Sequence, residues 1–120
     1  MLRFACSILA ATTAAVLLAA GVAAPSALAD SSCADLKVCF WSQADFDGDK
    51  RSYDADDAGS MKELNSHDRS IKNKFGSRRV QIMNAQGTII DCIDAGINEN
   101  NMLAASDYFK IGATNTSCPG

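Results

Sequence analysis

The sequence is poor in the residues from which catalytic and metal sites are most often built. It has a single histidine, His67, and no CxxC cysteine pair among its 120 residues. Without them, neither a zinc site nor a Ser-His-Asp arrangement can be argued from the spacing of residues. Asp68 directly follows His67, so in a strand the two side chains would point to opposite sides. We therefore expect no enzymatic activity, no cofactor and no bound metal.

Clustered positive charge is also lacking. The chain has 11 basic and 14 acidic residues, which gives a formal net charge of −3. Its one basic run, from Lys72 to Arg79, lies among acidic residues. Nucleic acids and anionic membranes both require a concentrated positive surface. The charge pattern therefore argues against either as the main partner.

Residues 1–29 have the composition of an export signal. Arg3 is the only charged residue before an apolar stretch from Cys6 to Ala24, and Ala27-Leu28-Ala29 places small residues where a signal peptidase reads them. The stretch is long enough to consider a membrane anchor, but it is rich in alanine and runs directly into the cleavage pattern. The sequence predicts a secreted protein, free of the membrane after cleavage, with one mature domain over residues 30–120.

Four cysteines remain after the predicted cleavage, an even number that is typical of an exported domain held by two disulfides. Four cysteines allow three pairings. Spacing favours Cys33–Cys39 and Cys92–Cys118, because each pair would tie one end of the chain to the body of the domain, but the sequence alone does not choose between the three. Each disulfide would contribute roughly 2–4 kcal/mol, the one that closes the shorter loop less.

The mature sequence predicts short strands separated by turns. Residues 79–83 alternate between polar and apolar side chains, Asn84-Ala85-Gln86-Gly87 closes a hairpin, and residues 88–93 follow as a second strand. One helical turn is expected over Met61 to Leu64, and a polar turn over Asn98 to Asn101. The other strand candidates are residues 38–41, 50–53, 70–73 and 108–111. Strands at such close spacing predict an all-β fold, a small sandwich or barrel.

The stretch from Phe40 to Gly48 indicates a more specific architecture. Phe40 ends a strand, Phe46 follows six residues later, and Gly48 lies two residues beyond that. This spacing suits a tight folded hairpin, with Phe46 packed over the turn and Gly48 in a conformation that a Cβ would not tolerate. The stretch resembles the folded hairpin of βγ-crystallin Greek key motifs. Residues 68–73 resemble the part of that motif from which a serine caps the hairpin, which implies that Ser70 hydrogen-bonds back to the corner near Gly48.

A narrower resemblance covers Cys33 to Asn73. The order Cys, then Val-Cys-Phe-Trp-Ser, then an Asp-Phe-x-Gly corner, then Ser-Ile-Lys-Asn is similar to that of the βγ-crystallin-like peptidase inhibitors, exported actinobacterial proteins whose founding type inhibits secreted metalloproteinases. The resemblance implies a disulfide-tied βγ-crystallin-like Greek key sandwich. It also implies a secreted inhibitor of an extracellular peptidase, and among peptidases it points to a metalloproteinase. A second Greek key should repeat the corner, but residues 84–87 offer only a plain turn.

The candidate inhibitory loop follows from what such an inhibitor must present, namely a rigid segment that enters the protease cleft as a substrate does. Thermolysin-like enzymes favour a bulky apolar residue just after the scissile bond. Cys92 and Ile93 provide that residue beside a cysteine, and residues 94–97 continue as a loop. The alternative is that Ile93 faces the core at the end of a strand.

The second function considered is a non-inhibitory module with a structural or weak calcium-binding role. A βγ-crystallin calcium loop needs two adjacent Asn or Asp residues, two variable residues and two hydroxyl residues, which supply oxygen ligands. Residues 67–72 lack the first Asn or Asp and both hydroxyls. Asn100-Asn101 supplies the first pair, but Ala104-Ala105 takes the place of the hydroxyls.

Trp41 bears on whether the scaffold has a separate binding face. Adjacent strand residues face opposite sides of a sheet, so one of Phe40 and Trp41 should lie in the core. An exposed Trp41 would indicate a binding surface. In the alternative, Trp41 is buried and Phe40 covers the disulfide.

Overall fold

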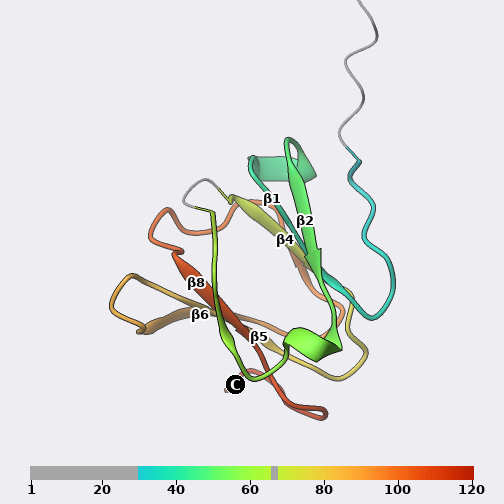
Figure 1. The fold of residues 1–120 in the computed structure, drawn as a ribbon, viewed down its shortest axis with the longest axis vertical. Coiled ribbons are helices and arrows are strands. Elements are labelled where there is room, and N and C mark those ends of the chain that lie inside the picture. The colour runs from blue at the N-terminus through green and yellow to red at the C-terminus, as the bar shows by residue number, and fades with distance from the viewer. Residues whose placement is uncertain (1–29, 66–67) are drawn as a thin grey trace, which may run out of the picture.

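A computed structural model describes residues 30–65 and 68–120 (Figure 1). The predicted export signal and His67 lie outside these residues. The described residues form eight strands and two short 3-10 turns, which confirms the all-β prediction. The strands are β1 Val38–Trp41, β2 Lys50–Tyr53, β3 Met61–Glu63, β4 Ser70–Asn73, β5 Val80–Met83, β6 Ile89–Ile93, β7 Asn98–Glu99 and β8 Tyr108–Ile111, and the 3-10 turns are η1 Ala44–Phe46 and η2 Ala55–Asp57.

The strands form two four-stranded sheets that exchange one strand each. The first sheet has the order β2-β1-β4-β7 and the second the order β3-β8-β5-β6, and all the pairings are antiparallel. Strands β1 to β4 are one Greek key and β5 to β8 the other. The third strand of each Greek key lies in the sheet of the other one: β3 belongs to the second sheet and β7 to the first. The exchange ties the two motifs into one sandwich, which is the predicted Greek key architecture.

The core lies between the two sheets and is built from alternate residues of the strands. On β1, Val38 and Phe40 point inward. The Phe40 ring lies 4.6 Å from the ring of Phe109 on β8 and 6.1 Å from that of Tyr53 on β2, measured between centroids. Aromatic pairs at these separations add to the free energy gained by burying apolar surface. Phe40 therefore joins the two sheets, and it does not cover the disulfide as one alternative held.

Two sequence predictions are wrong because they rest only on the local conformational preference of the residues. Residues 61–63 of the expected helical turn form β3, which pairs with β8 from Met61 opposite Lys110 to Glu63 opposite Tyr108. Residues 98–99 of the expected polar turn form β7, which pairs with β4. A four-residue helix carries the cost of nucleation without propagation, so pairing with a distant strand prevails.

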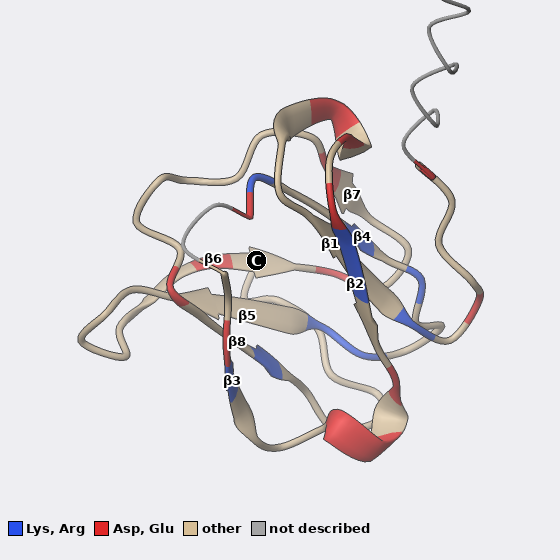
Figure 2. Cartoon of the chain, turned by 45° about the horizontal axis from the view of Figure 1, so that its top comes forward, with Lys and Arg blue, Asp and Glu red and all other residues tan. Residues whose placement is uncertain are grey.

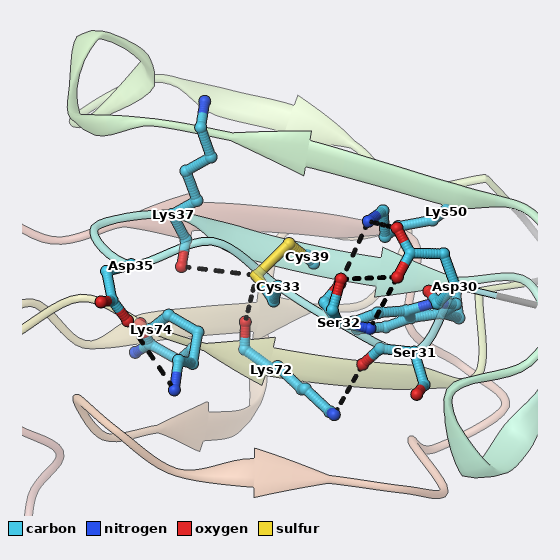
Figure 3. Close-up of a disulfide and its surroundings, with 12 residues drawn as sticks. Asp30, Ser31, Ser32, Cys33, Asp35, Lys37, Cys39, Lys50, Lys72 and Lys74 are labelled. Carbon is cyan, nitrogen blue, oxygen red and sulfur yellow. Dashed lines mark hydrogen bonds and ion pairs between the residues drawn. A yellow bond between two sulfur atoms is a disulfide. The ribbon is translucent and has the colours of Figure 1, made fainter.

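The segment before β1 covers the outer face of the first sheet (Figure 3). The Trp41 indole Nε1 donates a 2.8 Å hydrogen bond to the Asp30 carbonyl oxygen, and Lys72 Nζ donates a 2.7 Å bond to that of Ser31. Lys50 Nζ lies 2.6 Å from Asp30 Oδ2, and this contact holds the pKa of Asp30 well below its usual range. Trp41 is fully buried, with 0% of its surface exposed. It is therefore not an exposed binding face.

Charged residues are distributed over both sheets (Figure 2). Basic residues colour β2, β3, β4 and β8, and acidic residues are prominent at η1 and η2. Both signs of charge are therefore interspersed in the described part of the chain.

Candidate functional site

The folded corner after β1 has the geometry that its sequence predicts. Gly48 has a φ of +81°, and a Cβ at this position would overlap the Ser42 hydroxyl, which accepts a 2.9 Å hydrogen bond from the Asp49 N–H. Asp45 and Phe46 also have positive φ angles, 58° and 60°. Residues other than glycine rarely adopt this backbone conformation, so the surrounding contacts must hold it.

Ser70 supplies two of those contacts. Its buried hydroxyl accepts a 3.0 Å hydrogen bond from the Phe46 N–H and donates a 2.6 Å bond to the Gln43 carbonyl oxygen. The Phe46 ring packs edge-on against Trp41, with 5.4 Å between the centroids. The corner is thus fixed from β4, 24 residues away in the chain, as the resemblance to the βγ-crystallin motif implied.

Replacing Ser70 by alanine is expected to lower the free energy of unfolding by about 2 kcal/mol, because two backbone groups lose their hydrogen-bond partner. Urea unfolding followed by Trp41 fluorescence measures the change. Ser52→Ala, an exposed serine on β2, is the matched control and should change the free energy by less than about 0.5 kcal/mol. Equal effects of the two substitutions would show that Ser70 does not hold the corner.

Asn73 organises the opposite end of β4. Its buried Nδ2 donates hydrogen bonds to three carbonyl oxygens, those of Arg78 at 2.8 Å and of Ile93 and Asp94 at 3.1 Å. Its Oδ1 accepts a 3.1 Å bond from the Phe75 N–H. One side chain therefore joins the connection between β4 and β5 to the end of β6. Sequence reasoning did not assign this role, and the polar residue at the end of an otherwise buried strand was the available signal.

Both disulfides lie at this end of the sandwich. They join Cys33 to Cys39 across 6 residues and Cys92 to Cys118 across 26, the pairing that spacing favoured. The C-terminal tail is held there by the Cys118 N–H, which donates a 2.6 Å bond to Asp94 Oδ1. We call this region, made of residues 33–37, 74–79, 94–97 and 112–118, the disulfide end.

The structure places the Cys92–Ile93 bond within β6, not in a free loop. Cys92 pairs with Gln81 and Ile93 with Val80 of β5, and Ile93 belongs to the core with 3% of its surface exposed. A peptidase could reach the Ile93 side chain only after β6 had left the sheet. The observed position is that of the alternative, in which Ile93 is a core residue. An Ile93→Asp variant would bury an unpaired charge and unfold the protein, so it cannot identify a reactive loop.

The ring closed by Cys33 and Cys39 is more accessible. Its turn, at Asp35 and Leu36, projects from the sheet, and Leu36 is 66% exposed with a φ of +61°. The Leu36 N–H donates a 3.0 Å bond to the Lys74 carbonyl, and the Lys74 N–H donates a 2.8 Å bond to that of Lys37. These bonds continue the pairing of β1 with β4 into the ring, so the ring is held at both its base and its tip.

A polar cleft of about 470 Å³ lies at the other end of the sandwich. Arg51, which forms an ion pair with the buried Asp68, lines it together with acidic side chains, among them Glu63 and Asp107. Among residues 30–65 and 68–120, no three His, Cys, Asp or Glu side chains are grouped so that they could hold a metal ion.

Glu99 on β7 is a carboxyl group with a raised pKa. Partial burial, and then a hydrogen bond and charge repulsion from Asp91 on β6, raise its pKa from 4.5 to about 7. The folded protein therefore keeps a proton that the unfolded chain has lost between these two pH values. The free energy of unfolding should fall as the pH rises from about 4.5 to about 7. Glu99→Gln should flatten this part of the pH profile in urea unfolding, whereas Glu63→Gln, at an exposed residue of β3, should leave it unchanged.

Comparison with solved structures supports the fold. The chain is similar to the Ca²⁺-bound βγ-crystallin domain of the abundant perithecial protein of Neurospora crassa, with a TM-score of 0.53 and 14% identity over 68% of this chain and 93% of that one. It is also similar to a second crystal structure of that protein, with a TM-score of 0.50 and 14% identity over 68% of this chain and 41% of that one. Identity this low establishes the βγ-crystallin fold alone.

Sequence comparisons address the family. No protein with a curated description is significantly similar in sequence to this chain. In the described residues, no helix is long and apolar enough to cross a membrane. Residues 26–87 match the model of peptidase inhibitor family I36, and this segment covers more than half of the chain, including the 33–39 ring, the folded corner and Ser70. The chain therefore belongs to peptidase inhibitor family I36.

Proposed function

We propose that this protein is exported, loses residues 1–29, and inhibits an extracellular metalloproteinase by binding to it, without a reaction of its own. The family match supports a peptidase as the partner. The two disulfides support export, because such bonds form and persist in oxidising compartments. Every described strand and both disulfides lie within residues 33–118, so a chain that begins at Asp30 contains the whole sandwich.

The observation that carries this proposal is the cross-linking of the disulfide end. Binding energy is lost when a loop must be ordered on contact, so a tight inhibitor presents segments that are already fixed. Here two disulfides and the hydrogen bonds of Asn73 fix four segments at once. The apolar side chains exposed there, Leu36 and Ile97, suit an enzyme that selects bulky apolar residues. A trypsin-like enzyme would select lysine or arginine.

The test is inhibition of a thermolysin-like metalloproteinase by the oxidised domain that begins at Asp30, with a trypsin-like serine protease assayed in parallel. We expect an inhibition constant in the nanomolar range for the metalloproteinase, typical of tight protease–inhibitor pairs, and at least about 100-fold weaker inhibition of the serine protease. The reduced and alkylated domain is the control and should not inhibit. A folded domain that inhibits neither enzyme would contradict the proposal, and preferential inhibition of the serine protease would contradict its metalloproteinase part.

The alternative, a non-inhibitory calcium-binding module, has one observation in its favour. Asn100 of the second candidate calcium loop lies against Asp45 of the corner, with 3.1 Å between Nδ2 and Oδ1. The fungal protein of similar fold is Ca²⁺-bound. A rise of the melting temperature by several degrees in millimolar calcium, together with no inhibition in the assay above, would favour this alternative.

A further inference from the structure

We propose that the peptidase-contacting surface of this inhibitor is formed by the 33–39 ring and the 94–97 loop, with Leu36 as the side chain that enters an apolar specificity pocket. This inference rests on the proposed inhibitory function and assigns its binding site. It places the site beside, but not at, the Cys92–Ile93 bond.

Leu36 is held in a position that is unfavourable for a leucine in the free protein. Its side chain is 66% exposed, and its φ of +61° is one that glycine or asparagine adopts far more readily. Neither feature helps the fold, because the Leu36 side chain is not part of the core cluster. A conformation of this kind persists only where surrounding structure enforces it, and such positions gather at functional sites. Here the Cys33–Cys39 disulfide and the Lys74 carbonyl enforce it.

Ile97 lies beside the end of β4, on the side opposite to Leu36. It is 53% exposed, and its carbonyl oxygen accepts a 3.0 Å bond from the Asn73 N–H. Gly96 in turn donates a 2.9 Å bond to the Asn73 carbonyl. Leu36 is bonded to Lys74, the residue after Asn73, from the β1 side. Two exposed apolar side chains therefore flank the end of β4 on fixed backbones.

The charged groups around Leu36 are suited to the rim of such a contact. The Asp35 side chain is 91% exposed, and its Oδ1 lies 3.9 Å from Lys74 Nζ. Figure 3 shows Asp35, Lys37 and Lys74 around the ring, with Asp35 beside Lys74. Protein interfaces combine an apolar centre with a polar, solvated border, and the centre supplies most of the affinity.

The shape of the ring explains how Leu36 would bind without the ring being cut. Proteases bind their substrates as extended strands, whereas Asp35 and Leu36 form a turn with a positive φ. The disulfide prevents the turn from straightening. The peptidase thus receives the leucine side chain without an extended peptide bond at its catalytic centre.

The test is the inhibition constant of four single variants of the oxidised domain. Leu36→Ser should weaken inhibition by about 10- to 100-fold and Ile97→Ser by about 10-fold, from the apolar surface that each would otherwise bury. The matched controls are Ile89→Ser and Leu103→Ser. These two residues are 52% and 51% exposed at the opposite end of the sandwich, and their substitution should change inhibition by less than about 2-fold. All four variants should keep the melting temperature of the parent, because the residues are exposed.

Two results would overturn the assignment while leaving the inhibitory function standing. One is a parent domain that inhibits while Leu36→Ser inhibits equally well. The other is a first cleavage at Cys92–Ile93 during prolonged incubation, detected by mass spectrometry. A parent domain that inhibits no peptidase would overturn the proposed function itself, and this site with it.

Amide hydrogen exchange in the complex gives a second readout that needs no substitution. New protection should fall on the amides of residues 34–35 and 95, because the Gly96 and Ile97 amides already donate hydrogen bonds in the free protein. Protection confined to residues 84–87 and 100–107, at the other end, would place the contact there and contradict the assignment.

Discussion

Replacing Asn73 by alanine is expected to lower the free energy of unfolding by roughly 3–5 kcal/mol, enough to unfold a domain of ordinary stability near body temperature. The substitution removes the amide that bonds three carbonyl oxygens and one N–H. Of these, the Asp94 carbonyl keeps its 3.1 Å bond from the Ile97 N–H. Asn73→Asp should be at least as harmful, because it puts a buried carboxylate oxygen in place of the amide donor. Urea unfolding followed by Trp41 fluorescence measures both changes.

Asn84 offers a matched control for this prediction. Its Oδ1 also accepts two backbone hydrogen bonds, from Gln86 at 3.0 Å and from Thr88 at 2.9 Å, but in an exposed turn where water can replace it. Asn84→Ala should therefore lower the free energy of unfolding by about 1 kcal/mol or less. If both alanine variants lost the same amount, Asn73 would not be the residue that joins the segments of the disulfide end.

Removing the Cys92–Cys118 disulfide by a double serine substitution is expected to lower the free energy of unfolding by roughly 3.5 kcal/mol. Opening the Cys33–Cys39 ring in the same way should lower it by roughly 2 kcal/mol. The difference follows from the chain entropy restored to the unfolded state, which grows with the 26-residue and 6-residue separations that the two bonds close. Thermal and urea unfolding of the two variants provide the comparison.

The inhibitory potency of the two disulfide variants should follow the opposite order to their stability. The Cys33/Cys39 variant loses the constraint on Leu36 and should inhibit poorly although it is the more stable of the two. The Cys92/Cys118 variant should still inhibit at a temperature where it is folded. If potency simply followed stability in both variants, the ring would have no role beyond holding the fold.

The folded corner could be predicted from the sequence because its determinants are close together. Phe40, Phe46 and Gly48 lie within nine residues, and the conformation that Gly48 adopts is one that few other residues tolerate. The position of Ile93 carried a usable signal as well. Val80 begins a cleanly alternating strand, and the residue paired with it across a hairpin must share its inward face.

The remaining features depend on partners that are distant in the sequence. Local preference favours a helical turn over residues 61–63, and β8, the partner that makes them a strand, lies more than 40 residues further along the chain. The conformation of Leu36 could not be predicted, because a leucine in the sequence does not indicate a positive φ as a glycine or an asparagine does. Only the disulfide and the bond to Lys74, both products of the completed fold, impose it.

The exchange of strands between the two Greek keys has a consequence for biosynthesis. β3 pairs with β8, which ends at Ile111, and Phe40 meets Phe109 on the same strand. The N-terminal half therefore cannot close its core while the chain is still being made, and folding waits for the last residues. In the export proposed above, the chain would cross the membrane unfolded, and this order of events would delay folding until transport is complete.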